Sequence, residues 1–173
     1  MRLENALTKC TGHDAPPTTT TTLAPTTTAA LTTTKKPACP VGYKWFQDHC
    51  YLFATTKANW LTARENCLTL NADLVSINTW DEDDFLLNEI EQHYTTRRRD
   101  SYYIGMVYDE GEYFWMDDTV VDYRNWGQRE PNCMDMECKA YISEYLGFKW
   151  ADARATYDRF YICERDMYKR HVD

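Results

Sequence analysis

The chain has 173 residues, a formal net charge of −8 and an aromatic content of 14%. Chains of this length usually form one domain around a single core, and the aromatic content argues against disorder over most of the sequence. There is no run of about 20 apolar residues, so no transmembrane segment is predicted. Seven cysteines fit an oxidising compartment better than the cytosol. We therefore expect an extracellular protein, either secreted or the ectodomain of a longer chain.

The charge is divided unevenly along the chain. Residues 1–38 carry four Lys or Arg and two acidic residues, whereas the remainder carries 15 Lys or Arg and 25 acidic residues. An acidic domain has the wrong sign to attract nucleic acid or anionic lipid, so neither is an expected partner. The basic run Arg97-Arg98-Arg99 is interpreted as a solvated connection between a helix and a strand. Contact with a sulfated or sialylated ligand is the alternative.

Residues 1–38 are predicted to form a disordered stalk. Residues 16–37 are dominated by Thr, Pro and Ala, and such a segment buries too little surface to offset the entropy lost on ordering. Thr with Pro in an exported chain is typical of an O-glycosylated stalk, so we expect a glycoprotein, with a plain linker as the alternative. The first residues lack the apolar stretch of a signal peptide, which favours a fragment of a longer protein.

The sequence after the stalk predicts two helices. Over residues 56–70, Trp60 and Cys67 recur near helical spacing. A second helix is expected to begin at Thr79, because Thr79 and Glu82 match a capping box and acidic residues in a first turn favour the helix dipole. One face of this second helix is apolar and contains Leu86, Ile90 and Tyr94.

Strand-like runs of aromatic and β-branched residues follow the second helix. They occupy residues 101–108, 112–116, 139–143, 148–150 and 160–164. Two helices followed by short strands indicate an α+β fold rather than a repeating βαβ sheet. The stretch 117–137 has few strand signals, and a loop of that length in a small domain is usually functional.

The long loop contains the tripeptide Glu130-Pro131-Asn132, and Asp152 follows later in the chain. Carboxylate and amide oxygens are the ligands that Ca²⁺ takes, usually six to eight with carbonyls and waters. A bond to proline adopts the cis form at modest cost, and a cis bond here would turn both flanking side chains toward one point. Taken alone, the tripeptide is also explained by a simple turn.

Motifs of the common enzyme classes are absent. There is no nucleophile motif of the GxSxG type and no glycine loop for phosphate. A glycosidase pair made of Glu130 and Asp152 is a minor alternative. No zinc-site spacing connects the four histidines, which are His13, His49, His93 and His171. We therefore expect that the chain is not an enzyme.

A series of cysteines and aromatic motifs runs in a fixed order from residue 39 to about residue 166. Its members are Cys39, Trp45, Cys50, Trp60, Cys67, Tyr103-Ile104-Gly105, Phe114-Trp115, Asn125-Trp126-Gly127, Glu130-Pro131-Asn132, Trp150 and Cys163. This series resembles the C-type lectin-like domain in its long form. The resemblance implies an α+β fold of two helices and short antiparallel strands, with disulfides and a long ligand-binding loop. It places the domain at residues 39–166, followed by a polar tail at 167–173.

The resemblance also implies a pairing of the cysteines. It pairs Cys39 with Cys50 and Cys67 with Cys163. The third bridge of the family would join Cys138 to position 155, which is Ala155 here. Cys133 is the substitute partner for Cys138, provided that the Cα atoms approach within about 7 Å. Cys10 is left as a free thiol, a partner for upstream sequence, or a link between two chains.

A sugar-binding Ca²⁺ site is implied by the same resemblance. Its ligands carry over onto Glu130, Asn132, Glu137 and Asp152. Asp135 is the alternative to Glu137 as the acid before the next cysteine. Ala151 stands where the family has an amide ligand, so water would supply that oxygen at reduced affinity. No second ion is expected, because Cys133 replaces an Asn often used at an auxiliary site.

The order Glu-Pro-Asn implies mannose-type sugars in this family. Glycans on cell-surface or microbial glycoconjugates are thus the expected partners, and one shallow site makes useful binding depend on several copies. Two alternatives remain. One is a protein-binding module of the same fold that needs no Ca²⁺, and the other is binding to a mineral surface, which the net acidity favours.

Overall fold

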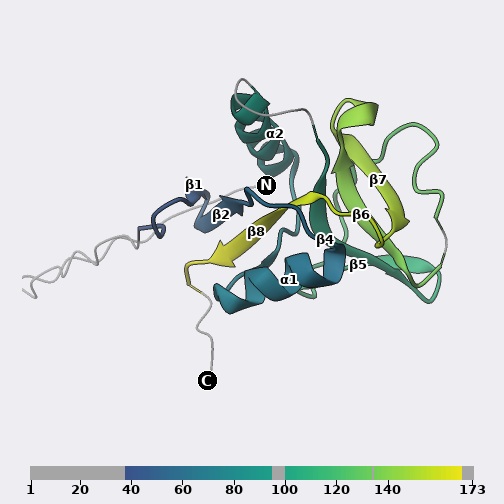
Figure 1. Cartoon of the computed structure of the whole chain (residues 1–173), viewed down its shortest axis with the longest axis horizontal. Coiled ribbons are helices and arrows are strands. Elements are labelled where there is room, and N and C mark those ends of the chain that lie inside the picture. Colours follow the sequence, from purple (N-terminus) through teal and green to yellow (C-terminus); the bar gives the residue numbers. More distant parts are fainter. Residues whose placement is uncertain (1–37, 95–99, 134, 169–173) are drawn as a thin grey trace, which may run out of the picture. The chain divides into compact units, whose positions relative to one another are not determined.

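The computed structural model describes residues 38–94, 100–133 and 135–168 (Figure 1). Residues 1–37 of the predicted stalk, which include Cys10, lie outside these ranges, as do the basic run 97–99 and residues 169–173 of the tail. No helix within them is long and apolar enough to cross a bilayer. The elements in chain order are β1 (Lys44–Phe46), β2 (His49–Phe53), α1 (Trp60–Thr69), β3 (Asp73–Leu74), α2 (Trp80–Tyr94), β4 (Tyr102–Asp109), β5 (Glu112–Trp115), β6 (Cys138–Ser143), the 3₁₀ turn η1 (Glu144–Leu146), β7 (Lys149–Arg154) and β8 (Phe160–Asp166).

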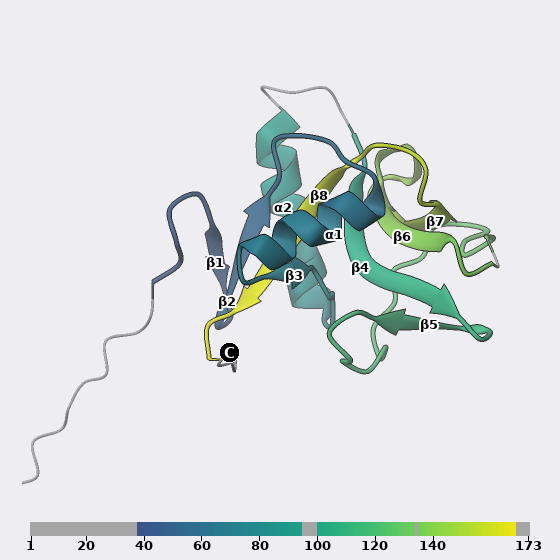
Figure 2. The ribbon, with the colours of Figure 1, turned by 60° about the horizontal axis from the view of Figure 1, so that its bottom comes forward.

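The strands form one sheet in the order β1-β2-β8-β4-β6-β7, with β3 added to β8 and β5 added to β4. The pairs are antiparallel except for β4 and β8, where Tyr102 lies opposite Phe160 in a parallel register. The expectation of antiparallel strands is corrected at this pair. Since β8 also pairs antiparallel with β2, the last strand connects the amino-terminal hairpin to β4 in the centre of the fold (Figure 2).

The two helices pack against opposite faces of β8. Successive side chains of a strand point to opposite faces. Tyr161 and Cys163 accordingly belong to the core cluster that contains the buried residues of α1. Ile162 belongs to the other cluster, with Leu86 and Ile90 of α2. The predicted apolar face of the second helix is therefore buried at Leu86 and Ile90, and Figure 2 shows α1 in front of the sheet and α2 behind it.

Helix α1 begins at Trp60, later than the expected residue 56. The reason is tertiary, because Ala58 exchanges both backbone hydrogen bonds with Arg159 and so is held in an extended conformation. Asn59 then caps the helix, since its side-chain oxygen accepts a hydrogen bond from the Thr62 N–H at 3.0 Å.

Helix α2 has the expected cap at Thr79. The Thr79 hydroxyl accepts a hydrogen bond from the Glu82 N–H at 3.2 Å. The Glu82 carboxylate accepts from the N–H of Asn78 at 2.9 Å instead of from Thr79, so only half of the capping box is formed. The side chain of Tyr94, expected on the apolar face, is outside the described part of the structure.

Among the described residues, three disulfides have the pairings that the sequence predicted. Their Cα–Cα distances are 5.6, 5.4 and 5.8 Å for Cys39–Cys50, Cys67–Cys163 and Cys133–Cys138 respectively. The first joins the segment before β1 to β2, and the second joins α1 to β8. The third lies at the end of the long loop, where β6 begins.

Candidate functional site

The long loop between β5 and β6 is anchored on a buried carboxylate of α2. Asp83 is 2% exposed. It accepts hydrogen bonds from Trp150 Nε1 at 3.1 Å, from the Tyr123 hydroxyl at 3.1 Å and from Asn125 Nδ2. Burial raises the pKa of Asp83, and these donors partly offset that rise. The sequence predicts an acidic first turn at this point of the helix, but not this anchoring role of Asp83.

Backbone contacts attach the loop to β7 just before the Glu-Pro-Asn segment. The Trp150 N–H donates to the Asn125 carbonyl at 2.8 Å, and the Gly127 N–H donates to the Trp150 carbonyl at 2.7 Å. The ring of Trp126 lies edge-on to that of Trp150, with 5.9 Å between centroids, and 4.9 Å from the ring of Tyr113 in β5. Just before the candidate site, the loop is therefore held by two backbone hydrogen bonds to β7 and by the packing of Trp126 on Trp150 and Tyr113.

Three of the predicted site residues lie together at the end of this loop. The Glu130–Pro131 peptide bond is cis. The Asp152 N–H lies 3.5 Å from Glu130 Oε2, and the Asn132 N–H donates to Asp152 Oδ1 at 2.8 Å. Asn132 is exposed and Glu130 is half-buried. A loop segment and a strand some twenty residues apart therefore meet here, with Asn132 at the surface, Glu130 half-buried and Asp152 buried.

Asp152 is engaged mainly by the protein itself. Its side chain also accepts from the Cys133 N–H, at 3.1 Å to Oδ1 and 3.0 Å to Oδ2, and from the Tyr113 hydroxyl. Burial, followed by the hydrogen bond to Asp152, raises the pKa of Tyr113 and keeps its hydroxyl protonated. Asp152 itself is 5% exposed. The family resemblance predicted Asp152 as a site residue but gave no sign of its partner Tyr113.

Glu130 has fewer hydrogen-bond donors than Asp152. Burial and the neighbouring Asp152 carboxylate raise the pKa of Glu130, while the Asn132 side chain favours its ionised form. In the described part of the chain no Lys, Arg or His forms an ion pair with either carboxylate. Two adjacent acids without a cationic partner are an arrangement that a bound cation would stabilise.

Asp135 and Glu137, the two candidates for a further acidic ligand, contact a basic residue instead. Arg154 of β7 donates to Asp135 Oδ2 from Nε at 3.1 Å and from Nη2 at 2.9 Å. It also lies 3.8 Å from Glu137 Oε2. This arginine holds the pKa of Asp135 below its usual range. No hydrogen bond joins Asp135 or Glu137 to the Glu130 carboxylate among the described residues.

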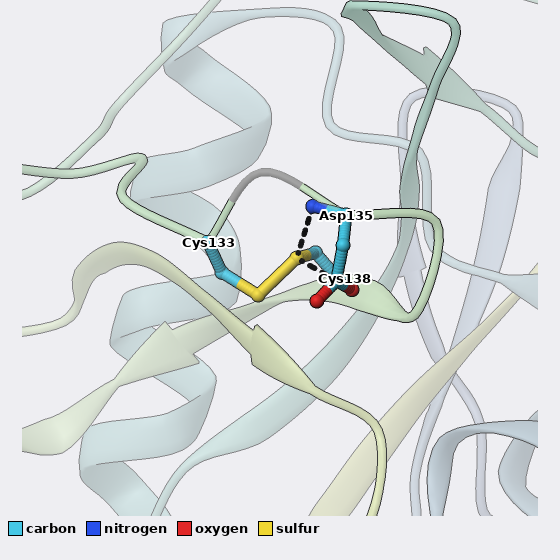
Figure 3. Close-up of side chains that lie close together, drawn as sticks. All are labelled: Cys133, Asp135 and Cys138. Carbon is cyan, nitrogen blue, oxygen red and sulfur yellow. Dashed lines mark hydrogen bonds between the residues drawn. A yellow bond between two sulfur atoms is a disulfide. The ribbon is translucent and has the colours of Figure 1, made fainter.

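One group of potential metal ligands in the loop does not form a metal site. The ligand atoms of Cys133, Asp135 and Cys138 lie within 4.8 Å of one another (Figure 3). Because the two sulfur atoms are bonded to each other, neither is available as the thiolate that a metal requires. The Asp135 N–H donates to Cys138 Sγ at 3.1 Å, which is a structural contact.

The comparisons with known proteins agree with the geometry. The model of the lectin C-type domain family matches residues 56–165 of this chain. The chain belongs to the C-type lectin family.

Two relatives illustrate this membership. A perlucin-like protein of Mytilus galloprovincialis is 29% identical over 129 residues, which cover 72% of this lectin and 81% of the mussel protein. C-type lectin domain family 4 member E of Mus musculus is 32% identical over 136 residues, covering 75% of this lectin and 61% of the mouse protein. The chain thus spans less than two thirds of the mouse relative.

Solved structures share the fold of this lectin. The SPL-1–GlcNAc complex has a TM-score of 0.69 at 29% identity and covers 76% of this chain and 97% of its own. The Ca²⁺-independent C-type lectin SPL-2 from Saxidomus purpuratus has a TM-score of 0.68 at 26% identity, with 76% and 96% coverage. The predicted α+β C-type lectin-like fold is confirmed, and the chain is a lectin-family protein and not an enzyme, as the sequence predicted.

Two other features of the lectin lie apart from the candidate site. A hollow of about 620 Å³ is lined by residues that include His49, Asp117 and Glu164 but by none of the predicted ligands. Beside it, the Tyr51 hydroxyl lies 2.7 Å from Glu82 Oε1 and 3.4 Å from Glu164 Oε1. Sequence reasoning missed this carboxylate pair, although Glu82 was recognised in the capping box.

Proposed function

We propose that this lectin binds mannose-type glycans in a Ca²⁺-dependent manner, as a secreted protein or the ectodomain of a longer chain. The observation that supports the proposal most strongly is the meeting of Glu130, Asn132 and Asp152. Their oxygens come from a loop and a strand, and the two carboxylates have no basic partner among the described residues. Glycans on cell surfaces or on microbes are the proposed partners.

The donor set fits a Ca²⁺ ion, with few protein ligands. Glu130 and Asn132 offer side-chain oxygens at the surface, whereas Asp152 already accepts from the protein. When bound, Ca²⁺ supplies a positive centre to which vicinal sugar hydroxyls coordinate. Glu130 would then accept a hydrogen bond from one sugar hydroxyl, and the Asn132 side-chain amide would donate a hydrogen bond to another. With so few protein ligands, we expect a dissociation constant for Ca²⁺ of about 10⁻⁴–10⁻³ M.

The sugar preference is proposed from the Glu-Pro-Asn order and from chemistry. The structural neighbour SPL-1 is known as a complex with GlcNAc, whose 3- and 4-hydroxyls are equatorial, as they are in mannose. A site that places an acceptor at Glu130 and an amide donor at Asn132 suits such a pair of hydroxyls. Because one shallow site binds weakly, several copies are needed for tight binding. We propose that the O-glycosylated stalk at residues 1–38 spaces the domain at residues 39–166.

Ca²⁺-independent recognition by the same domain is the second candidate. Two observations favour it. The Asp152 carboxylate already accepts hydrogen bonds from several protein donors, and the Asp135 carboxylate is paired with Arg154. The neighbour SPL-2 is a C-type lectin that is Ca²⁺-independent. The two candidates differ in whether binding survives a chelator.

The first prediction is tested by calorimetry on the purified chain. Ca²⁺ is titrated alone and then with mannose, galactose or GlcNAc, and each titration is repeated in EDTA. We expect heat from mannose and GlcNAc only when Ca²⁺ is present. The double variant Glu130→Gln, Asn132→Asp should shift the preference toward galactose. Undiminished sugar or protein-ligand binding in excess EDTA would establish the second candidate instead.

The second prediction concerns Ala151, which replaces an amide ligand. Ala151 is 1% exposed in β7. We expect Ala151→Asn to strengthen Ca²⁺ and mannose binding. In EDTA the variant should be about 1–3 kcal/mol less stable, because the added amide is buried without a partner. Ala153→Asn, on the same strand, is the matched control and should leave the affinity for Ca²⁺ unchanged. Equal affinities in both variants would contradict the assignment of position 151.

A further inference from the structure

The contacts of Asp152 nearly exhaust its capacity to accept hydrogen bonds. A carboxylate has about four lone-pair directions. Three donors occupy most of these directions: Oδ1 accepts from the Asn132 N–H, Oδ2 accepts from the Tyr113 hydroxyl, and the Cys133 N–H is shared between the two oxygens. Successive backbone N–H groups of a loop make a concave anion-binding site. Here the anion is the Asp152 carboxylate of the same chain, and the N–H groups of the two residues after Pro131 point toward it.

Tyr113 reaches the same point from a different strand. Its hydroxyl contacts Asp152 and lies 3.1 Å from the Cys133 carbonyl. Its ring packs against those of Tyr108, at 5.1 Å between centroids, and Trp126, at 4.9 Å. These two contacts restrict the movement of the ring and of its hydroxyl. It therefore connects β5 to both the loop and β7.

The end of the loop is tethered a second time. Cys133 is joined covalently to Cys138, which begins β6 and is fully buried. Asp135 lies between them in the sequence, and its Oδ2 accepts hydrogen bonds from two guanidinium nitrogens of Arg154 in β7, Nε and Nη2. This exposed ion pair contributes little by itself. The disulfide, however, limits how far the backbone of Cys133 can move from the sheet.

We propose that Asp152 is a positioning residue, which, with Tyr113 and the Cys133–Cys138 disulfide, holds the ligand loop in its binding conformation by protein contacts alone. Ca²⁺ then binds to a loop that is already formed. The carboxylate that remains available to the ion is that of Glu130, because Asp152 already accepts hydrogen bonds from the protein. The inference rests on the proposed function only in that this loop carries the proposed sugar site. Removal of Ca²⁺ therefore abolishes sugar binding but leaves the loop ordered.

Amide hydrogen exchange, followed residue by residue by NMR, tests this proposal. The exchange rates of the Asn132 and Cys133 amides are measured in EDTA and again in saturating Ca²⁺. We expect both amides to be protected in EDTA, with rates that change less than about threefold on adding Ca²⁺. The amide of Ile162 in the core, which donates within the sheet, serves as the internal reference for global unfolding.

Variants separate local positioning from overall stability. In EDTA, Asp152→Asn should accelerate exchange at Asn132 and Cys133 at least about tenfold, since a hydrogen bond to a charged group is among the stronger ones. Tyr113→Phe should accelerate exchange at Cys133 by about threefold or more, while Ile162 is unaffected. Tyr108→Phe is the matched control, because its ring packs on Tyr113 while its hydroxyl forms no hydrogen bond with the loop residues that the structure describes. It should change neither rate.

The outcomes distinguish this inference from the proposed function. Rapid exchange of both amides in EDTA, with protection appearing only in Ca²⁺, would show that the ion orders the loop and would overturn the inference. Rates in Tyr113→Phe equal to those in Tyr108→Phe would also overturn it for Tyr113. Protected amides in a protein whose calorimetry shows no Ca²⁺-dependent sugar binding would leave the inference intact and reject the proposed function.

Discussion

Two neighbouring carboxylates, Glu82 of α2 and Glu164 of β8, link helix and sheet through a single hydroxyl donor, that of Tyr51. The Ser76 N–H also donates to Glu164 Oε2 at 2.9 Å, and His49 Nε2 lies 3.7 Å from Oε1. Burial, followed by the charge of Glu82, raises the pKa of Glu164 well above its ordinary value of 4.5. At neutral pH the protein therefore holds two acids at a cost to its stability.

The third prediction is a pH dependence that originates in this pair. A carboxyl group whose pKa is higher in the folded state contributes stability below about pH 4.5, and that contribution is lost as the pH rises through the folded-state pKa. In EDTA, we expect Glu164→Gln to be more stable than the parent chain near pH 7 and to lose less stability between pH 4.5 and 7. Thermal unfolding across that range measures the effect. Exposed Glu65→Gln is the control, and parallel pH profiles for all three proteins would contradict the prediction.

At the scale of elements, Asp83 allows one helix to position a loop and a strand. Its carboxylate on α2 accepts hydrogen bonds from Tyr123 and Asn125 of the loop and from Trp150 of β7. The candidate site lies between the same loop and the same strand. Helix α2 thus stabilises the site through Asp83, although no residue of α2 is among the proposed ligands.

The fourth prediction follows from the three donors on Asp83. Asp83→Ala leaves them without an acceptor in a buried position, so we expect a loss of about 3 kcal/mol in the free energy of unfolding, measured by urea denaturation. Mannose binding should weaken as well, because Asn125 no longer fixes the loop. Asp81→Ala removes an exposed acid from the same turn and should cost less than about 1 kcal/mol. Equal losses in the two variants would show that Asp83 acts only through the helix dipole.

At the scale of the whole molecule, two disulfides have different tasks. Cys67–Cys163 closes a span of 96 residues and joins α1 to the central strand β8, whereas Cys133–Cys138 spans 5 residues within the ligand loop. In the chain-entropy account a bridge stabilises more when it closes a longer segment of the unfolded chain. The long bridge therefore supports the global fold and the short one supports the site.

The fifth prediction compares the removal of each bridge. Replacing both Cys67 and Cys163 by Ala should cost about 2–5 kcal/mol in unfolding free energy. Replacing Cys133 and Cys138 by Ser should cost less but should accelerate amide exchange at Asn132. Non-reducing peptide mapping first verifies the pairings in the parent chain. Similar unfolding free energies for the two double variants would contradict this division.

The sequence alone determined the features that depend on neighbouring residues. The α+β class, the cap at Thr79, the buried face at Leu86 and Ile90, and the long loop with Glu130 follow from periodicity, capping and turn chemistry, which act within a few residues. Strands β1 and β3, of three and two residues, are too short for such patterns and were not predicted, nor was the five-residue β2, which pairs with the last strand of the chain.

The tertiary structure alone decided what depends on distant partners. The start of α1 was set by the pairing of Ala58 with Arg159, and the parallel pairing of β4 and β8 depends on the last strand of the chain. Likewise, Asp152 was identified from its motif, but its engagement by Tyr113 and the pairing of Asp135 with Arg154 were not. A carboxylate offers the same oxygens to an ion, a backbone N–H or an arginine. Which of them it meets is determined by the packing of segments far apart in the sequence.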